Sequence, residues 1–280
     1  MTGRWKLRLL ALGGSVAGLV LLPAVINAIF VSPTAVFMDH RNPSAQITLG
    51  NSGDSPEEAE IDLQFGFPDA DSAGTPFVRL MEYPGPQFPS AAGWIRPFPR
   101  RVRLEPGDRQ IVRLLAQPPT DLPDGEYWSR MIVTGRRGSV PVASSDTAVR
   151  AGVSLEMRLV TSITYRKGRV TTGISVSDFA AEAGGDSLVT WARFTRLGNG
   201  AFLGTATFDA LDDGGRTVRT WPTVIAVYYA QYRRFTFPLA ALGAGEYVLR
   251  LTLTSDRPDL QRGQATPAAT VTDSVAFTVR

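Results

Sequence analysis

Apolar and polar residues alternate with a period of two along much of this chain, in short runs that turn residues separate. Between residues 59 and 65, for example, apolar residues at the odd positions alternate with Glu60, Asp62 and Gln64. This period is typical of a β-strand with one buried and one solvated face. Further strands in the first half are predicted within 30–39, 45–49, 77–81, 102–104, 110–115, 127–133 and 153–159.

The second half of the chain continues this pattern. The whole sequence carries 27 Gly and 20 Pro scattered between the runs, so many short strands fit it better than long helices. Two Gly-rich turns, 198–200 and 212–215, allow the positive backbone angles of hairpins, and the turn 105–108 is predicted to close another hairpin. Strands of the second half are predicted within 170–176, 187–195, 201–210, 217–229, 233–239, 246–253 and 271–279.

One unit occurs twice, as Leu122–Tyr127 and as Leu242–Tyr247, 120 residues apart. Each copy has turn residues, then a Gly, and then a Tyr that begins an alternating run. This arrangement resembles the corner before the penultimate strand of an immunoglobulin-like domain, and the spacing corresponds to one such sandwich. We therefore predict an all-β fold of two tandem immunoglobulin-like β-sandwich domains, at residues 29–166 and 167–280.

The first 28 residues have the composition of an export signal. Arg4, Lys6 and Arg8 precede an apolar stretch from Leu9 to Leu22, and Ala28 offers a small residue for cleavage. An uncleaved anchor helix is the alternative, because the uncharged span continues past residue 31 and is long enough to cross a bilayer. In both cases the two sandwiches lie outside the cytoplasm.

Charge and cysteine content argue against two classes of function. The chain has 29 Lys and Arg against 26 Asp and Glu, and three of these cations lie within residues 1–28. Without the leader the formal charges balance, which removes the electrostatic basis for nucleic-acid binding. Because the sequence contains no Cys, thiolate chemistry and cysteine metal sites are unavailable, and both cores must rely on apolar packing.

Residues suited to catalysis are scarce. His40 is the single histidine, which argues against a histidine-based triad and against a zinc site with two histidines. We interpret His40 as a turn residue, and the acidic pairs 57–58 and 212–213 as solvated turns, because adjacent strand residues point to opposite faces. Neither a catalytic activity nor a cofactor is predicted, and an enzyme acting on envelope glycans is the least favoured hypothesis.

An apolar row lies near the end of the first domain, on a strand whose other face is polar and includes Ser154, Glu156 and Arg158. The row is either the buried face of an ordinary strand or an apolar edge that is offered to another protein. In the second case the strand would add to the sheet of a partner, and the apolar side chains would fill pockets there. The row consists of Val153, Leu155, Met157 and Leu159.

Several segments of the first domain carry a resemblance to one family. They are Ser32–Pro33–Thr34 with Val36 and Phe37, residues 47–53, Pro99, residues 103–114, residues 122–127 and the strand 153–166. On these segments the chain is similar to the N-terminal domain of the periplasmic pilus chaperones, the PapD-like family. The resemblance covers about residues 30–166 and is most specific at 103–114. The second domain resembles the family only in length and sandwich pattern.

The resemblance implies a chaperone that lends the row 153–159 to an incomplete pilin-like subunit until an outer-membrane usher takes the subunit over. It also implies two cations that hold the C-terminal carboxylate of the subunit, but the aligned positions are Ala35 and Ser162. Each lost charge-assisted bond is worth about 1.5–3 kcal/mol. We therefore interpret the chain as a divergent member in which other cations take this role. The candidates are Arg130, Arg158, Arg166 and Lys167.

Two hypotheses for the function follow. The first is a periplasmic chaperone-like protein that binds a pilin-like or other secreted subunit by β-strand addition for pilus assembly, with or without an usher. The second is a non-catalytic structural or adhesion-related protein of the cell envelope, tethered by its leader if the leader stays uncleaved. Both hypotheses require no nucleic acid and no cofactor, and both limit membrane contact to residues 1–28.

Overall fold

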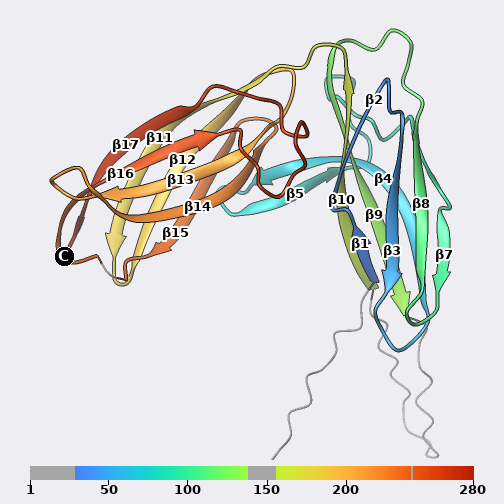
Figure 1. The fold of residues 1–280 in the computed structure, drawn as a ribbon, viewed down its shortest axis with the longest axis horizontal. Coiled ribbons are helices and arrows are strands. Elements are labelled where there is room, and N and C mark those ends of the chain that lie inside the picture. The colour runs from blue at the N-terminus through green and yellow to red at the C-terminus, as the bar shows by residue number, and fades with distance from the viewer. Residues whose placement is uncertain (1–28, 138–155, 241) are drawn as a thin grey trace, which may run out of the picture.

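The computed structural model describes residues 29–137, 156–240 and 242–280. These residues form strands, turns and loops, and no helix among them is long and apolar enough to cross a membrane. The leader predicted at residues 1–28 lies outside the described residues. Figure 1 shows two elongated β-domains that meet at one end in an L-shape.

The first domain is a sandwich of two sheets. One sheet has the strand order β1-β3-β8-β6, and the other has the order β2-β10-β9-β4-β5 with β7 beside β4. The alternating side chains of both sheets meet in a dry core, in which Ile47, Leu114 and Val133 are almost fully buried. The strands are β1 (Ile29–Ser32), β2 (Ala35–Asp39), β3 (Ser44–Asn51), β4 (Glu57–Ala70), β5 (Pro76–Met81), β6 (Ile95–Phe98), β7 (Arg101–Leu104), β8 (Arg109–Ala116), β9 (Gly125–Arg137) and β10 (Glu156–Lys167).

The second domain is also a sandwich, with sheets of order β11-β12-β15 and β14-β13-β16-β17. Its own core includes Phe194, Phe208 and Leu251, which are fully buried. Each strand range predicted from the sequence within the described residues contains a strand, which confirms the all-β fold of two sandwich-like domains. The strands are β11 (Thr172–Gly184), β12 (Ser187–Gly198), β13 (Phe202–Leu211), β14 (Thr217–Val227), β15 (Gln231–Pro238), β16 (Gly245–Thr254) and β17 (Val271–Val279).

The repeated sequence unit forms the same corner in both domains. The hydroxyl of Tyr127 donates to the carbonyl of Pro123 at 2.8 Å, four residues back along the chain. The hydroxyl of Tyr247 donates to the carbonyl of Gly243 at 3.0 Å, again four residues back. Each tyrosine therefore ties the start of its strand to the preceding turn, as the sequence predicts.

Two of the three predicted hairpin turns are wrong. The turn 105–108 connects β7 to β8, and the turn 198–200 connects β12 to β13, but in both cases the two strands belong to different sheets. Of these three turns, 212–215 alone closes a hairpin, between β13 and β14. After a turn at the end of a sandwich, the chain can either pair with the preceding strand in the same sheet or cross to the other sheet. The same turn residues occur in both connections, so the sequence of the turn does not distinguish a hairpin from a crossing between sheets.

Candidate partner-binding site

Strand β10 has one edge that is only partly covered. Its other edge pairs along the whole strand with β9. On the partly covered edge, β2 pairs in parallel with residues 162–166, and no described strand pairs with residues 156–161 on this edge. Backbone groups alternate between the two edges of a strand, and the N–H of Ser162 donates towards the β2 side. The N–H groups of Arg158 and Val160 therefore point to the uncovered edge, which can accept a further strand.

The apolar row predicted from the sequence lies in this part of β10. Met157 and Leu159 are half-buried and pack against the core of the first domain. Val160 lies on the opposite face of the strand and is 40% exposed. Val153 and Leu155 lie outside the described residues. Met157 and Leu159 are therefore neither fully buried nor fully exposed, and their role in binding a partner stays a prediction.

A cleft lies where the uncovered edge ends and the two domains meet. Residues of β2, β9 and β10 line it from the first domain, and Tyr228 and the segment 257–264 line it from the second domain. The acidic residue in this lining is Asp259, which Arg257 binds at 2.6 Å. Arg130 of β9 also lines the cleft, so the described lining carries one cation without an acidic partner.

Arg130 is an unusual residue in this position because it is buried and no described residue supplies a counter-charge. It is only 5% exposed, and its Nε and Nη2 atoms have no hydrogen-bond partner among the described residues. Its guanidinium carbon lies 5.3 Å from the ring centroid of Tyr228. This cation–π contact compensates in part for the water that the buried cation has lost. A buried cation attracts an anion more strongly than a solvated one does, because the local dielectric constant is low.

The strand register places the implied anchor positions at this cleft. Ser162 lies directly opposite Ala35 on one side and opposite Arg130 on the other, and all three residues line the cleft. Arg130 therefore lies in the same row across the sheet as the two positions that lack a cation. One of the four candidate cations is thus found where the resemblance implies a carboxylate, and carboxylate binding itself stays a prediction.

The other three candidate cations have different surroundings. Arg158 is exposed on the uncovered part of β10. Arg166 donates from Nε to Glu126 at 2.8 Å, and its Nη atoms donate to two backbone carbonyls of the second domain. Lys167 donates to a backbone carbonyl at 3.3 Å. These contacts of Arg166 connect the two domains, so its guanidinium N–H groups already have acceptors.

Glu126 is the centre of the connection between the domains, and no pattern in the sequence indicates this role. Its side chain is 1% exposed. One carboxylate oxygen accepts from Arg166, and the other accepts from the N–H of Ala201 at 2.8 Å and from Trp128 Nε1 at 3.2 Å. The backbone N–H of Glu126 donates to the carbonyl of Asn199 at 3.1 Å. The turn at Asn199, predicted as a hairpin, is therefore a contact between domains.

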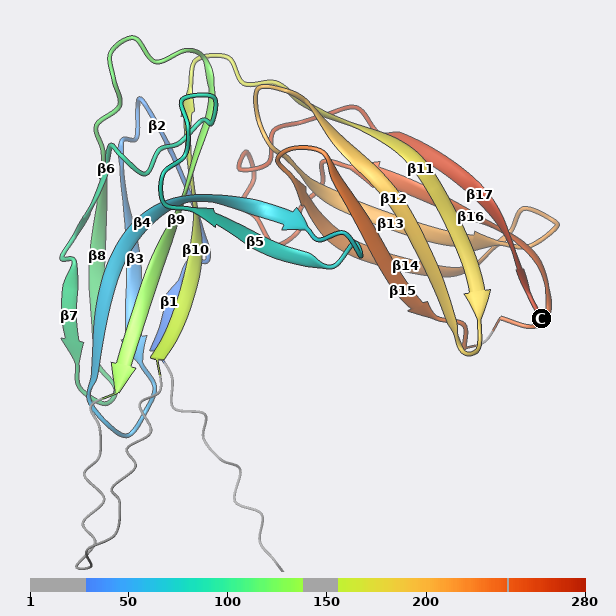
Figure 2. The same cartoon turned by 180° about the vertical axis from the view of Figure 1, so that it is seen from behind.

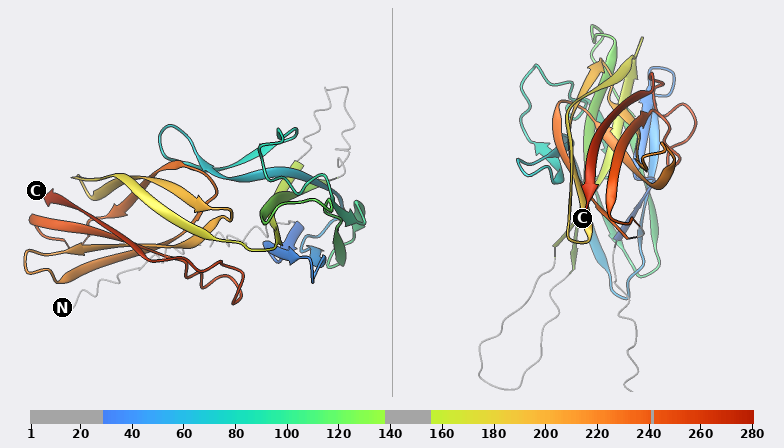
Figure 3. Two further views of the ribbon diagram at one scale, coloured as in Figure 1. Left: turned by 90° about the horizontal axis from the view of Figure 1, so that it is seen from above. Right: turned by 90° about the vertical axis from the view of Figure 1, so that its left-hand side faces the viewer.

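Apolar and backbone contacts reinforce this interface. Burial raises the pKa of the partly enclosed Tyr229, although nearby Arg196 opposes the shift. The β4–β5 hairpin extends from the first domain along the second (Figures 2 and 3), and the carbonyl of Gly74 at its tip accepts from the N–H of Arg234 at 3.1 Å. A buried cluster shared by both domains consists of Phe65, Phe67, Trp128, Ala201, Leu203 and Tyr228.

The other polar residues that the sequence singles out lie in different surroundings. His40 is exposed after β2, as predicted. The pair 57–58 is not a solvated turn, because both residues belong to β4, where Glu57 is buried and Glu58 is exposed. Within the described ranges, no group of three or more His, Asp or Glu side chains is placed to hold a metal ion.

Comparisons with known proteins found similarity in structure only. No family model matches the sequence, and no curated protein matches it. The solved structure of the YadV chaperone matches with 15% identity and a TM-score of 0.46, over 88% of this chain and 99% of that one. The CsuC–CsuE chaperone–tip subunit complex from Acinetobacter baumannii matches with 12% identity and a TM-score of 0.43, over 89% and 98%. The CupB2 chaperone of Pseudomonas aeruginosa matches with 13% identity and a TM-score of 0.39, over 88% and 98%.

Proposed function

We propose that this chain is a periplasmic chaperone-like protein that binds a secreted, pilin-like subunit by β-strand addition. A strand of the subunit pairs with the uncovered edge of β10 at residues 156–161, and the C-terminal carboxylate of the subunit binds Arg130 in the cleft between the domains. An outer-membrane usher would then take over the subunit.

The observation that carries this proposal is the buried guanidinium of Arg130, which has no acidic partner among the described residues, beside an uncovered strand edge. A buried charge without an acidic partner is costly for the folded state, and this cost is offset if the residue binds an anionic ligand. The C-terminal carboxylate is the one group of a peptide backbone that carries a full negative charge. A cation placed just past the uncovered residues of β10 therefore matches the C-terminus of a strand that lies along them.

The proposal is tested with an eight-residue peptide rich in Val and Thr, prepared with a free C-terminal carboxylate and with a C-terminal amide. We expect the free acid to bind at least about tenfold more tightly, since a hydrogen-bonded charge contributes about 1.5–3 kcal/mol. Arg130→Met should abolish the preference for the acid and keep the thermal midpoint the same or raise it, because the variant removes an unpaired buried charge.

Lys167→Met is the matched control, because Lys167 is a cation of the same predicted set that does not line the cleft. This variant should keep the preference for the free acid. Equal binding of acid and amide by the unmodified protein, or a preference that survives in Arg130→Met, would contradict the proposed role of Arg130.

One observation favours the second hypothesis, a structural protein of the cell envelope. Met157 and Leu159 already pack against the core of the first domain, as expected for a strand that stabilises its own sandwich. A structural protein of this kind would bind neither form of the peptide, so the same measurement distinguishes the two functions.

A further inference from the structure

The outer face of the sheet that contains β10 carries its charges in rows. Residues directly opposite each other on neighbouring strands lie on the same face, with their Cβ atoms about 5 Å apart. The strand register therefore defines two rows that run from β7 through β4 and β9 to β10. The first row consists of Arg103, Glu58, Arg136 and Glu156. The second row consists of Arg101, Glu60, Thr134 and Arg158.

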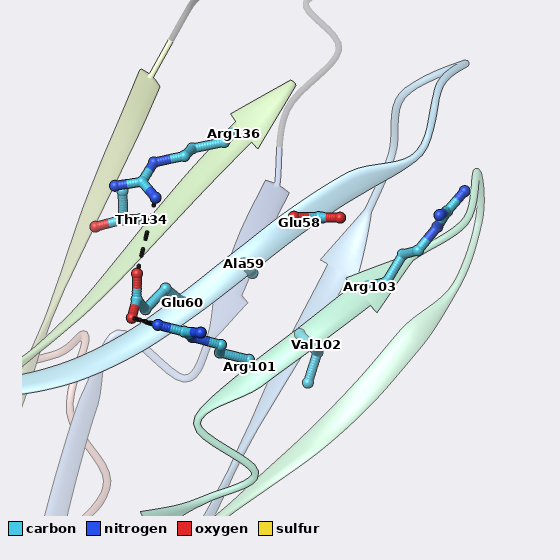
Figure 4. Close-up of a pocket in the computed structure, with 8 residues that line it drawn as sticks. All are labelled: Glu58, Ala59, Glu60, Arg101, Val102, Arg103, Thr134 and Arg136. Atoms are coloured by element: carbon cyan, nitrogen blue, oxygen red, sulfur yellow. Dashed lines mark hydrogen bonds and ion pairs between the residues drawn. The ribbon is translucent and has the colours of Figure 1, made fainter. Parts of the chain in front are cut away.

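Most of these charges are compensated within the sheet. Figure 4 shows Glu60 between two arginines: it accepts from Arg101 at 2.9 Å and lies 3.9 Å from Arg136. Arg136 also donates to Glu156 at 3.2 Å. Arg158, at the edge, has no acidic partner among the described residues. Both rows end on the part of β10 with which no described strand pairs on that edge, so a strand added there would supply the next position in each row.

We infer that these rows select the sequence of the added strand, an inference that rests on the proposed function. The side chain opposite Glu156 is a cation, the side chain opposite Arg158 is an acid, and the side chain opposite Val160 is apolar. An opposite charge extends the alternation of each row, whereas a like charge directly opposite is destabilising. Val160 is 40% exposed and gains burial from an apolar neighbour.

The direction of the strand follows from the cleft. Its C-terminus must reach Arg130, which is level with Ser162 and therefore beyond Val160. The strand must then run parallel to β10, in the same direction as β2. The side chains between the selected positions lie on the face of Met157 and Leu159, which is apolar. The partner is thus a protein whose C-terminal strand has the order cation, apolar, acid, apolar, apolar, shortly before its free carboxylate.

The test uses two labelled peptides of identical composition with free C-termini. The matched peptide ends in Lys-Val-Glu-Val-Val-Thr, and the swapped peptide ends in Glu-Val-Lys-Val-Val-Thr. Fluorescence anisotropy should show that the matched peptide binds about three- to tenfold more tightly at low salt. Because the pairs are exposed, this preference should weaken as the salt concentration rises. The double variant E156K/R158E should reverse the preference, and E156Q/R158Q should abolish it.

D62K/R100E is the matched control. It exchanges the exposed ion pair between Asp62 on β4 and Arg100, which lies outside both rows and away from the uncovered edge, and should keep the original preference. If both peptides bind with the same affinity, or if E156K/R158E does not reverse their order, the inference about the rows is wrong while carboxylate-dependent binding still stands. If neither peptide binds, both the proposed function and the inference are wrong.

Discussion

Replacing Glu126 by Ala should uncouple the two domains without unfolding either of them. The carboxylate accepts three hydrogen bonds, from Arg166, Ala201 and Trp128, and two of these donors are themselves buried. Removal of one partner from a buried ionic network costs about 3–5 kcal/mol, because the donors lose their acceptor away from water. Each sandwich keeps a core of its own, so the cost falls on the interface.

Small-angle X-ray scattering measures the uncoupling as an increase in the radius of gyration, and calorimetry measures it as a separation of the two unfolding transitions. Glu246→Ala is the matched control, because Glu246 occupies the equivalent position in the second copy of the repeat and is exposed. It should change stability by less than about 0.5 kcal/mol. If Glu126→Ala leaves both the scattering and the melting profile unchanged, the carboxylate does not hold the domains together.

Two further predictions concern backbone contacts and pH. Gly74→Ala should destabilise the interface more than Gly215→Ala destabilises its turn. Both residues have a positive φ, but a Cβ at Gly74 would lie 2.5 Å from the backbone nitrogen of Arg234, whereas Gly215 faces open space. Equal losses of unfolding free energy for the two variants in denaturant titrations would contradict the importance of this contact. Burial, and secondly the charge of Asp124, raise the pKa of Tyr127 in the folded protein. The protonated hydroxyl of Tyr127 therefore stabilises the fold fully below about pH 10, and this contribution is lost as the pH rises through the raised pKa of the folded state. Tyr127→Phe should therefore unfold with a weaker dependence on alkaline pH, and an unchanged dependence would contradict the assignment.

The position of the strands could be predicted from the sequence because most of them bury one face. Alternation in β16, for example, gives buried Leu249, Leu251 and Leu253, and this pattern is visible without coordinates. The end of β4 was not predictable in this way. Pro68 suggests a loop, yet it lies in the strand opposite Val78, where β4 pairs only with β5. Proline is tolerated there because one edge of β4 has no neighbouring strand that needs its N–H.

The surroundings of the residues in the candidate site could not be predicted from the sequence. Glu126 and Glu246 stand in the same local sequence, Gly-Glu-Tyr, yet one is buried and the other is exposed. The difference arises because Arg166 and the backbone of the second domain surround Glu126, and no local pattern encodes such distant neighbours. For the same reason the sequence offers four candidate cations, whereas strand register and burial are needed to propose Arg130 among them.

The interface and the cleft depend on each other through Tyr228. This residue belongs to the second domain and covers the guanidinium of Arg130 on the first. If the domains were free to separate, water would reach Arg130, and its attraction for a carboxylate would fall as the local dielectric constant rises. The network around Glu126 lies outside the lining of the cleft, but under the proposed function it would set how strongly Arg130 binds an anion. The relative position of the two sandwiches is thus the property on which the proposed binding site depends.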